Sequence, residues 1–139
     1  MKKLAFALLP LLFASPALAE RTMQPGQYEV TVTMEMEGGH AMPPRTHTRC
    51  VKPEDVKSPE QIVQQMQEHS RGDCEIKDVK FAGGKISWVM QCKQGGGTGE
   101  VQLTSGGYAG KAQMAFTDAR GNKHNATVTF TGKRTGDCQ

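Results

Sequence analysis

Aromatic residues and an excess of either charge are both scarce in this sequence. Only 6% of the 139 residues are Phe, Trp or Tyr, while 16 are Gly, which is typical of short strands and turns rather than of a helical bundle. The formal net charge is +3, and it falls to +1 once the two lysines of the leader described below are removed. Nucleic-acid binding needs a concentrated basic face, which is not visible here, so we expect no nucleic-acid partner.

Motifs of the common enzyme classes are also missing. The sequence holds no GxSxG nucleophile elbow, no HExxH zinc motif and no Walker loop. The glycine-rich residues 94–99 lack the Lys-Ser/Thr pair that a phosphate-binding loop requires. We therefore expect a protein without enzymatic activity and without a cofactor.

A hydrophobic run long enough to cross a bilayer is absent, because the apolar residues 4–18 are fewer than the roughly 20 that a helix needs. Lys2 and Lys3 precede this run, and Ala17 and Ala19 form a small-x-small cleavage site after it. This order predicts a cleavable signal peptide over residues 1–19. We expect the remaining residues 20–139 to form a single domain without a transmembrane segment, located in the periplasm or, alternatively, secreted.

Closely spaced cysteine pairs, which bind zinc, are lacking as well. Cys50, Cys74, Cys92 and Cys138 stand far apart, and an even number in an exported small domain predicts two disulfides. A hairpin that turns at residues 82–84 would place Cys74 directly opposite Cys92, within disulfide range. If the later strands form a meander and a helix crosses from pole to pole, Cys50 and Cys138 share a pole. We therefore predict the pairs Cys74–Cys92 and Cys50–Cys138.

Alternation of apolar and polar residues is what the sequence does contain. Residues 28–37 alternate between apolar side chains and Glu or Thr, which predicts a strand with one buried face. Ser58, Pro59 and Gln61 predict a capped helix start. Similar alternation farther along brings the number of predicted strands to about seven. The sequence thus predicts a mainly β fold, either a curved antiparallel sheet or a small β-barrel with one α-helix, with a β-sandwich as the alternative.

Several short motifs are similar to those of a known bacterial family. They are PGQYE at residues 25–29, Cys50 followed by PED at 53–55, WVMQC at 88–92, TGE at 98–100 and TGKRTGDC at 131–138. Together they resemble the family catalogued as domain of unknown function 3617, over almost the whole of residues 20–139. Tyr28 stands where that family more often has tryptophan. The resemblance implies an exported, periplasmic protein, and it supplies no activity, ligand or catalytic residue.

A group of soft metal ligands follows the first predicted strand. His40, Met42 and His47 lie in or beside the loop there, and thioether and imidazole side chains suit copper, particularly Cu(I). Met34 and Met36 continue the buried alternation of the strand, so we expect them to belong to the core. A periplasmic copper-binding or other metal-binding protein is therefore one hypothesis.

The leading hypothesis is a small envelope binding module without catalytic activity. Small barrels can hold an apolar ligand in their interior. The candidates for lining such a cavity are the inward-facing residues Trp88, Met90, Tyr28, Met114 and Phe116. The sequence leaves two kinds of partner open, an apolar small molecule and another protein of the envelope.

Overall fold

The structure is a computed structural model that describes residues 23–69 and 73–139. The predicted signal peptide lies outside these described residues. The elements are β1 (Gly26–Met36), β2 (His40–Ala41), β3 (Arg45–Val51), the 3-10 helix η1 (Pro53–Asp55), α1 (Pro59–His69), β4 (Cys74–Ala82), β5 (Lys85–Cys92), β6 (Gly95–Thr104), β7 (Gly107–Thr117) and β8 (Lys123–Gly136).

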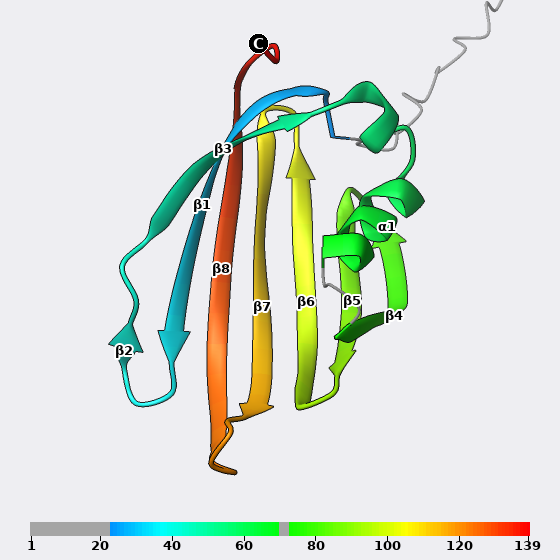
Figure 1. The fold of residues 1–139 in the computed structure, drawn as a ribbon. Coiled ribbons are helices and arrows are strands. Elements are labelled where there is room, and N and C mark those ends of the chain that lie inside the picture. The colour runs from blue at the N-terminus through cyan, green and yellow to red at the C-terminus, as the bar shows by residue number, and fades with distance from the viewer. Residues whose placement is uncertain (1–22, 70–72) are drawn as a thin grey trace, which may run out of the picture.

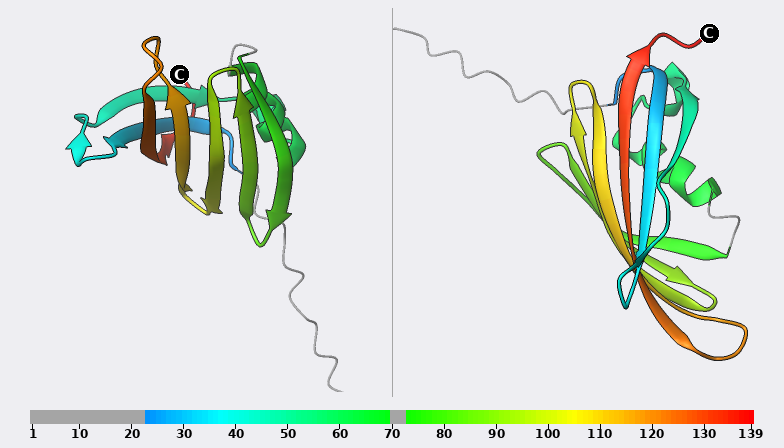
Figure 2. Two further views of the ribbon diagram at one scale, coloured as in Figure 1. Left: turned by 90° about the horizontal axis from the view of Figure 1, so that it is seen from below. Right: turned by 90° about the vertical axis from the view of Figure 1, so that its left-hand side faces the viewer.

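All of these strands belong to one antiparallel sheet, in the order β2-β1-β8-β7-β6-β5-β4 (Figure 1). β3 pairs with β1 along the same edge as β2. Within the described residues β3 and β4 do not pair with each other, so the sheet stays open at both sides. The sheet is strongly curved and twisted, with α1 against one of its faces (Figure 2). The predicted mainly β curved sheet is confirmed, and the closed barrel and the sandwich are not formed.

The sheet has eight strands rather than about seven because the arm that returns along β1 is divided. β2 pairs with the end of β1, and β3 pairs with its first part. Pro43 and Pro44 lie between β2 and β3. Since proline has no N–H to donate to a ladder, the pairing is interrupted at this point.

We call the face of the sheet that α1 covers the inner face. Ile62 and Val63 of α1 contact a buried cluster on it that includes Trp88 and Leu103. Ile62 also contacts a second buried cluster, which includes Tyr28. By register, the inner face holds the even-numbered residues 28–36, 86–92, 108–116 and 124–134 and the odd-numbered residues 45–51 and 95–103.

Both disulfides have the predicted pairing. Cys50 bonds Cys138 and Cys74 bonds Cys92, at sequence separations of 88 and 18 residues. Two disulfides in a small domain are consistent with an oxidising, exported environment.

The β4–β5 hairpin reaches the predicted Cys74–Cys92 pair by a different route. The turn is two residues long, Gly83 and Gly84, and not three. Both glycines have positive φ, 58° and 77°, as the tight turn that matches the twist of a hairpin requires. A β-bulge between Lys77 and Lys80 adds one residue to β4, and this compensates for the shorter turn.

The start of α1 is close to the predicted one. The backbone N–H of Gln61 donates to Ser58 Oγ at 3.4 Å, as expected for a helix cap. The Gln61 side chain does not close a capping box with the N–H of Ser58, since its Oε1 accepts the N–H of Lys57 at 3.0 Å.

Candidate functional site

Three aromatic residues of the inner face lie opposite glycines of the neighbouring strand. The pairs are Trp88 with Gly99, Phe130 with Gly110, and Tyr108 with Gly132. A Cβ atom built on any of these glycines would collide with the ring of its partner. Each ring therefore lies over the adjacent backbone, in the space that the absent side chain leaves free.

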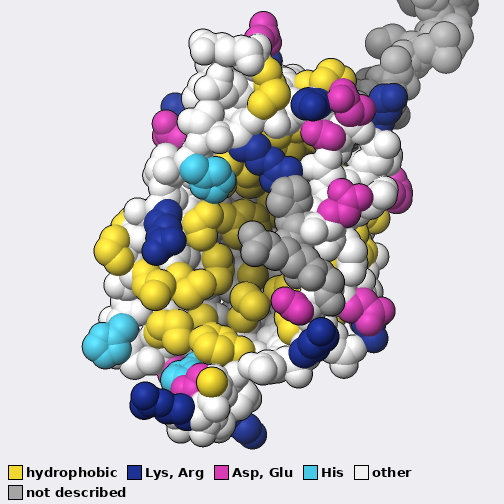
Figure 3. Space-filling view, viewed as in Figure 1, with side chains coloured by type: hydrophobic (Ala, Val, Ile, Leu, Met, Phe, Trp, Pro, Cys, Tyr) yellow, Lys and Arg dark blue, Asp and Glu magenta, His cyan; other side chains and the backbone are white. Residues whose placement is uncertain are grey.

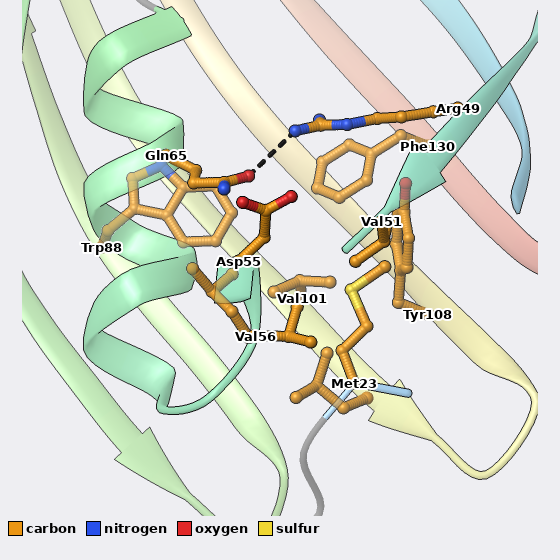
Figure 4. A pocket seen from close by; sticks show the side chains of 12 residues that line it. Met23, Arg49, Val51, Asp55, Val56, Gln65, Trp88, Val101, Tyr108 and Phe130 are labelled. Carbon is orange, nitrogen blue, oxygen red and sulfur yellow. Dashed lines mark hydrogen bonds between the residues drawn. The ribbon is translucent and has the colours of Figure 1, made fainter. Parts of the chain in front are cut away.

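The three rings contribute to the floor of a pocket of about 450 Å³ between the sheet, η1 and α1 (Figure 4). Its lining is Met23, Arg49, Val51, Asp55, Val56, Ile62, Gln65, Trp88, Val101, Leu103, Tyr108 and Phe130. Most of these side chains are apolar, and the polar ones come from η1, α1 and β3. A concave, mainly apolar pocket of this size with a few polar groups is typical of a small-molecule site.

The polar groups of the pocket connect β3 to the helical segment. Arg49 Nη2 donates a hydrogen bond to Gln65 Oε1 at 3.0 Å (Figure 4). Arg49 is exposed, so this bond lies at the solvent side of the pocket. The carboxylate of Asp55 accepts the backbone N–H of Lys52 at 3.2 Å, which caps the start of η1.

Two tyrosines support the floor as neutral groups. Burial raises the pKa of Tyr108, and the charge of Arg49 opposes this rise only in part. Burial likewise raises the pKa of Tyr28, whose hydroxyl donates to the carbonyl of Gln24 at 2.7 Å. The two rings are 5.9 Å apart. Both hydroxyls therefore stay protonated at neutral pH and act as structural groups.

The structure places the predicted cavity residues in three different surroundings. Trp88 lines the pocket and is 5% exposed. Tyr28 and Met90 belong to the packed clusters beside it and do not line it. Met114 and Phe116 lie farther along the inner face, where the Phe116 ring stacks on His124 at a centroid distance of 5.3 Å.

The pocket also contains residues that were not among the predicted cavity candidates. Val101, Leu103, Tyr108 and Phe130 were recognisable as inward-facing from their alternation, but their glycine partners follow only from the register. Arg49 gave no signal, because a charged residue at an inward position is indistinguishable in sequence from one at the surface.

Beyond α1 the inner face continues as a half-buried apolar surface, which we call the open strip. It consists of Val32, Met34, Met36, Met114, Phe116 and Val128. Hydrophobic side chains gather over the middle of the sheet in the space-filling view (Figure 3). A ligand in the pocket would therefore have apolar surface available next to it.

The whole of this arrangement falls within one family match. Residues 23–138 match the family described as Protein of unknown function (DUF3617). The chain belongs to the DUF3617 family. No curated protein and no solved structure matches it. Membership of DUF3617 assigns no function to the chain, because the family itself is described as one of unknown function.

In this DUF3617 protein, two of the predicted metal ligands lie on the β1–β2 ribbon. His40 is directly opposite Met36 in the register. The N–H of Met42 donates to the carbonyl of Met34 at 2.8 Å, which extends the ladder and brings these two residues beside each other. Met42 is 52% exposed, whereas Met34 and Met36 are half-buried.

The third predicted metal ligand lies elsewhere. His47 is opposite Val30, six residues before Met36 on β1. Because a strand rises about 3.3 Å per residue, His47 is about 20 Å from His40 along the sheet, too far to share an ion with it. Across the described residues, no group of three or more His, Cys, Asp or Glu side chains is placed to hold a metal. The same residues include no helix that is long and apolar enough to cross a bilayer.

Proposed function

We propose that this DUF3617 protein is a non-enzymatic binding protein of the bacterial envelope, and that it holds a small apolar ligand between its inner face and α1. The pocket of about 450 Å³ under α1 carries this proposal. Burial of an apolar ligand there would release about 25 cal/mol per Å² of apolar surface removed from water.

The construction of the pocket supports a binding role. Gly99, Gly110 and Gly132 let the rings lie down on the sheet, so space remains above them for another molecule. The described lining contains no Ser, Cys, His or Lys, and its two groups that could act as acid or base are Asp55, whose carboxylate accepts the N–H of Lys52, and Tyr108, whose pKa is raised by burial. We therefore propose binding without chemistry.

The proposed location is the periplasm, with secretion as the alternative. The predicted signal peptide supports export, and the two disulfides are consistent with an oxidising compartment. Cell fractionation with and without cleavage at Ala19 would test this part of the proposal.

Native mass spectrometry of the protein purified gently from cells tests the binding function. We expect a fraction of the protein to carry a non-covalent mass that organic solvent extracts. The variant Val101→Phe fills the pocket and should lose this mass, because Val101 is a buried wall residue. The matched control Val89→Phe adds the same ring to an exposed position on the opposite face and should keep it.

A protein partner is the competing possibility for the same apolar surface. It would be supported if both variants and the wild type carried no small molecule and crosslinking in cells captured one defined protein through the open strip. We favour the small molecule because the pocket is roofed by α1, which leaves room for a narrow ligand and not for a flat protein surface.

Copper binding is a second candidate function, and the register of the β1–β2 ribbon favours it. Met34, Met36, His40 and Met42 lie on one face as two directly opposed pairs, and opposed residues have Cβ atoms about 5 Å apart. Such a set of soft ligands suits Cu(I). Titration with Cu(I) should show one site that His40→Ala plus Met42→Ala removes and His47→Ala leaves intact. An affinity unchanged by the double variant would end this candidate.

A further inference from the structure

A row of basic residues on β3 reaches the pocket at one end, where Arg49 is part of the lining. Arg45, His47 and Arg49 occupy the inner-face positions of β3, and all three are exposed. Their partners on β1 are Val32, Val30 and Tyr28. This row, which we call the basic edge, therefore lies beside apolar residues of β1 that pack next to the pocket and do not line it.

The basic edge is not neutralised by acidic side chains of the described residues. Neither Arg45 nor Arg49 has an ion pair there, and the hydrogen bond of Arg49 goes to the uncharged amide of Gln65. Arg134 provides the contrast on the same face, because its guanidinium bonds the carboxylate of Asp137 at 2.7 Å.

One acidic residue, Asp55, lines the pocket, and its carboxylate offsets positive charge there. Its carboxylate already accepts the N–H of Lys52, which satisfies part of its hydrogen-bonding capacity. Within the described lining, Arg49 and Asp55 carry one charge of each sign, and Arg45 lies four residues farther along β3, opposite Val32. The charge that could attract an anion is therefore that of the Arg49 guanidinium, which is exposed at the solvent side of the pocket and has no ion pair among the described residues.

We propose that the ligand is a single-chain amphiphile with an anionic head group, whose chain lies in the pocket and whose head group binds Arg49 on the basic edge. This inference rests on the proposed function and names its class of ligand. A guanidinium offers two parallel N–H donors that match a carboxylate or phosphate, and it remains charged at every physiological pH. Arg45 and His47 extend the contact surface beside Arg49.

Inward charges on an edge strand also have a purely structural use, since they prevent association of one sheet with another. Any charged residue meets that need, including glutamate. Reversal of the charge at Arg49 therefore keeps the protection of the edge and removes the attraction for an anion. This difference makes Arg49→Glu the decisive variant.

The single tryptophan of the chain, Trp88, lies in the pocket wall and reports directly on its occupancy. The oxidised protein without residues 1–19 is titrated with decanoate, 1-decanol, decyltrimethylammonium and acetate, and Trp88 emission is recorded. We expect decanoate to bind about tenfold more tightly than 1-decanol, as for a gained charged hydrogen bond. Decyltrimethylammonium should bind more weakly than 1-decanol, and acetate should leave the emission unchanged.

The variants separate this inference from the proposed function. Arg49→Glu should reduce the affinity for decanoate to that for 1-decanol or below, and Arg49→Lys should retain part of the preference. Lys123→Glu, at an exposed position whose side chain has no hydrogen bond or ion pair with the described residues, should leave both affinities unchanged. Equal affinities for decanoate and 1-decanol in the wild type would overturn the anionic head group and leave apolar binding intact. Absence of any response to all three ten-carbon probes would overturn both.

Discussion

At the scale of single residues, the pocket depends on three glycines, whose lack of a side chain leaves room for an aromatic ring. The glycines at 99, 110 and 132 have ordinary backbone angles, and their role is to leave space for a ring. Gly106 differs from them, because a Cβ atom there would meet nothing within 4 Å. This contrast allows the steric role of the paired glycines to be measured.

Gly99→Ala is expected to destabilise the protein by about 1–3 kcal/mol, because the new methyl group displaces the Trp88 ring from its packed position. Emission of Trp88 should change at the same time. Gly106→Ala should alter the free energy of unfolding by less than about 0.5 kcal/mol. Urea denaturation of both variants measures this, and equal stabilities would show that the ring does not depend on the missing side chain.

Asp118 gives a pH dependence of stability at the β7–β8 turn. His124 Nε2 lies 2.9 Å from its Oδ2, and the N–H groups of Asn122 and Arg120 donate to its Oδ1. The hydrogen bond from His124, followed by those from the turn backbone, lowers the pKa of Asp118 well below its ordinary value of 3.8. The folded state therefore favours the carboxylate, and the stabilisation is present above the unfolded pKa and is lost as pH falls below it.

Replacement of Asp118 by Asn should accordingly remove part of this dependence on pH. We expect the stability difference between wild type and Asp118→Asn to be largest above about pH 5 and to shrink between about pH 4 and pH 2. Thermal unfolding of both proteins across this range is the measurement. A difference that stays constant with pH would contradict the assignment.

The orientation of single residues was predictable from the sequence where apolar and polar residues alternate along a strand. The inward positions of Trp88 and Tyr28 followed from period-two patterns, and both are buried. The pairing of Trp88 with Gly99 was not predictable, because it needs the register between two strands. The inward orientation of Arg49 was not predicted, because a charged side chain is expected on the solvent face of a strand.

At the scale of elements, α1 is the part of the site whose stability depends most on contacts with the rest of the fold. It has 11 residues, and an isolated helix of this length is marginal in water. Besides its apolar contacts, hydrogen bonds of the described side chains Gln65 and Gln67 hold it to the sheet. Gln67 donates to the carbonyl of Cys74 at 3.3 Å and accepts the N–H of Ile76 at 3.1 Å, and Arg49 bonds Gln65. The Gln67 side chain thereby makes one donor and one acceptor hydrogen bond with the backbone of β4, as the backbone of a neighbouring strand would.

Hydrogen exchange should therefore resolve α1 from the sheet. We expect the amides of α1 to exchange earlier than those of β6, β7 and β8, because these strands are paired on both sides. Decanoate should slow exchange in α1 more than in β8, since the proposed ligand contacts the underside of the helix. Protection of α1 equal to that of β7 without ligand would contradict this ranking.

The elements themselves were largely predictable, and their attachments were not. Ser58 and Gln61 marked the start of α1 because capping is a local interaction. The contact between Gln67 and β4 joins segments whose relation depends on the whole fold. The β-bulge in β4 was missed for a similar reason, since one extra residue leaves no trace in a short alternating pattern.

At the scale of the whole molecule, the decisive feature is that the sheet does not close. Alternation predicted a curved sheet and a barrel equally well, because both have one apolar face. Closure would bury the inward side chains of β3, and Arg45 and Arg49 are among them. Burial of unpaired charges is costly, so these residues oppose pairing of β3 with the far edge of the sheet.

The two disulfides stabilise this open molecule unequally. In the loop-entropy model, the bridge at a separation of 88 residues contributes about 4–5 kcal/mol and the one at 18 residues about 3 kcal/mol. We therefore expect Cys50→Ser with Cys138→Ser to lower the free energy of unfolding more than Cys74→Ser with Cys92→Ser. Urea denaturation of the two oxidised double variants tests this, and the reverse order would contradict the entropic explanation.

The nested order of these bridges has a consequence for how the protein matures. Cys74–Cys92 lies entirely inside the loop that Cys50–Cys138 closes, so the native partner of the first cysteine is the last one. A chain oxidised from its N-terminus onward would meet Cys74 as the first available partner of Cys50 and would trap a non-native bridge. Correct maturation then depends on thiol–disulfide exchange, in which a thiolate reopens that bridge. An oxidant alone would produce a mixture of isomers, whereas an isomerase or a thiol buffer would convert it to the native form.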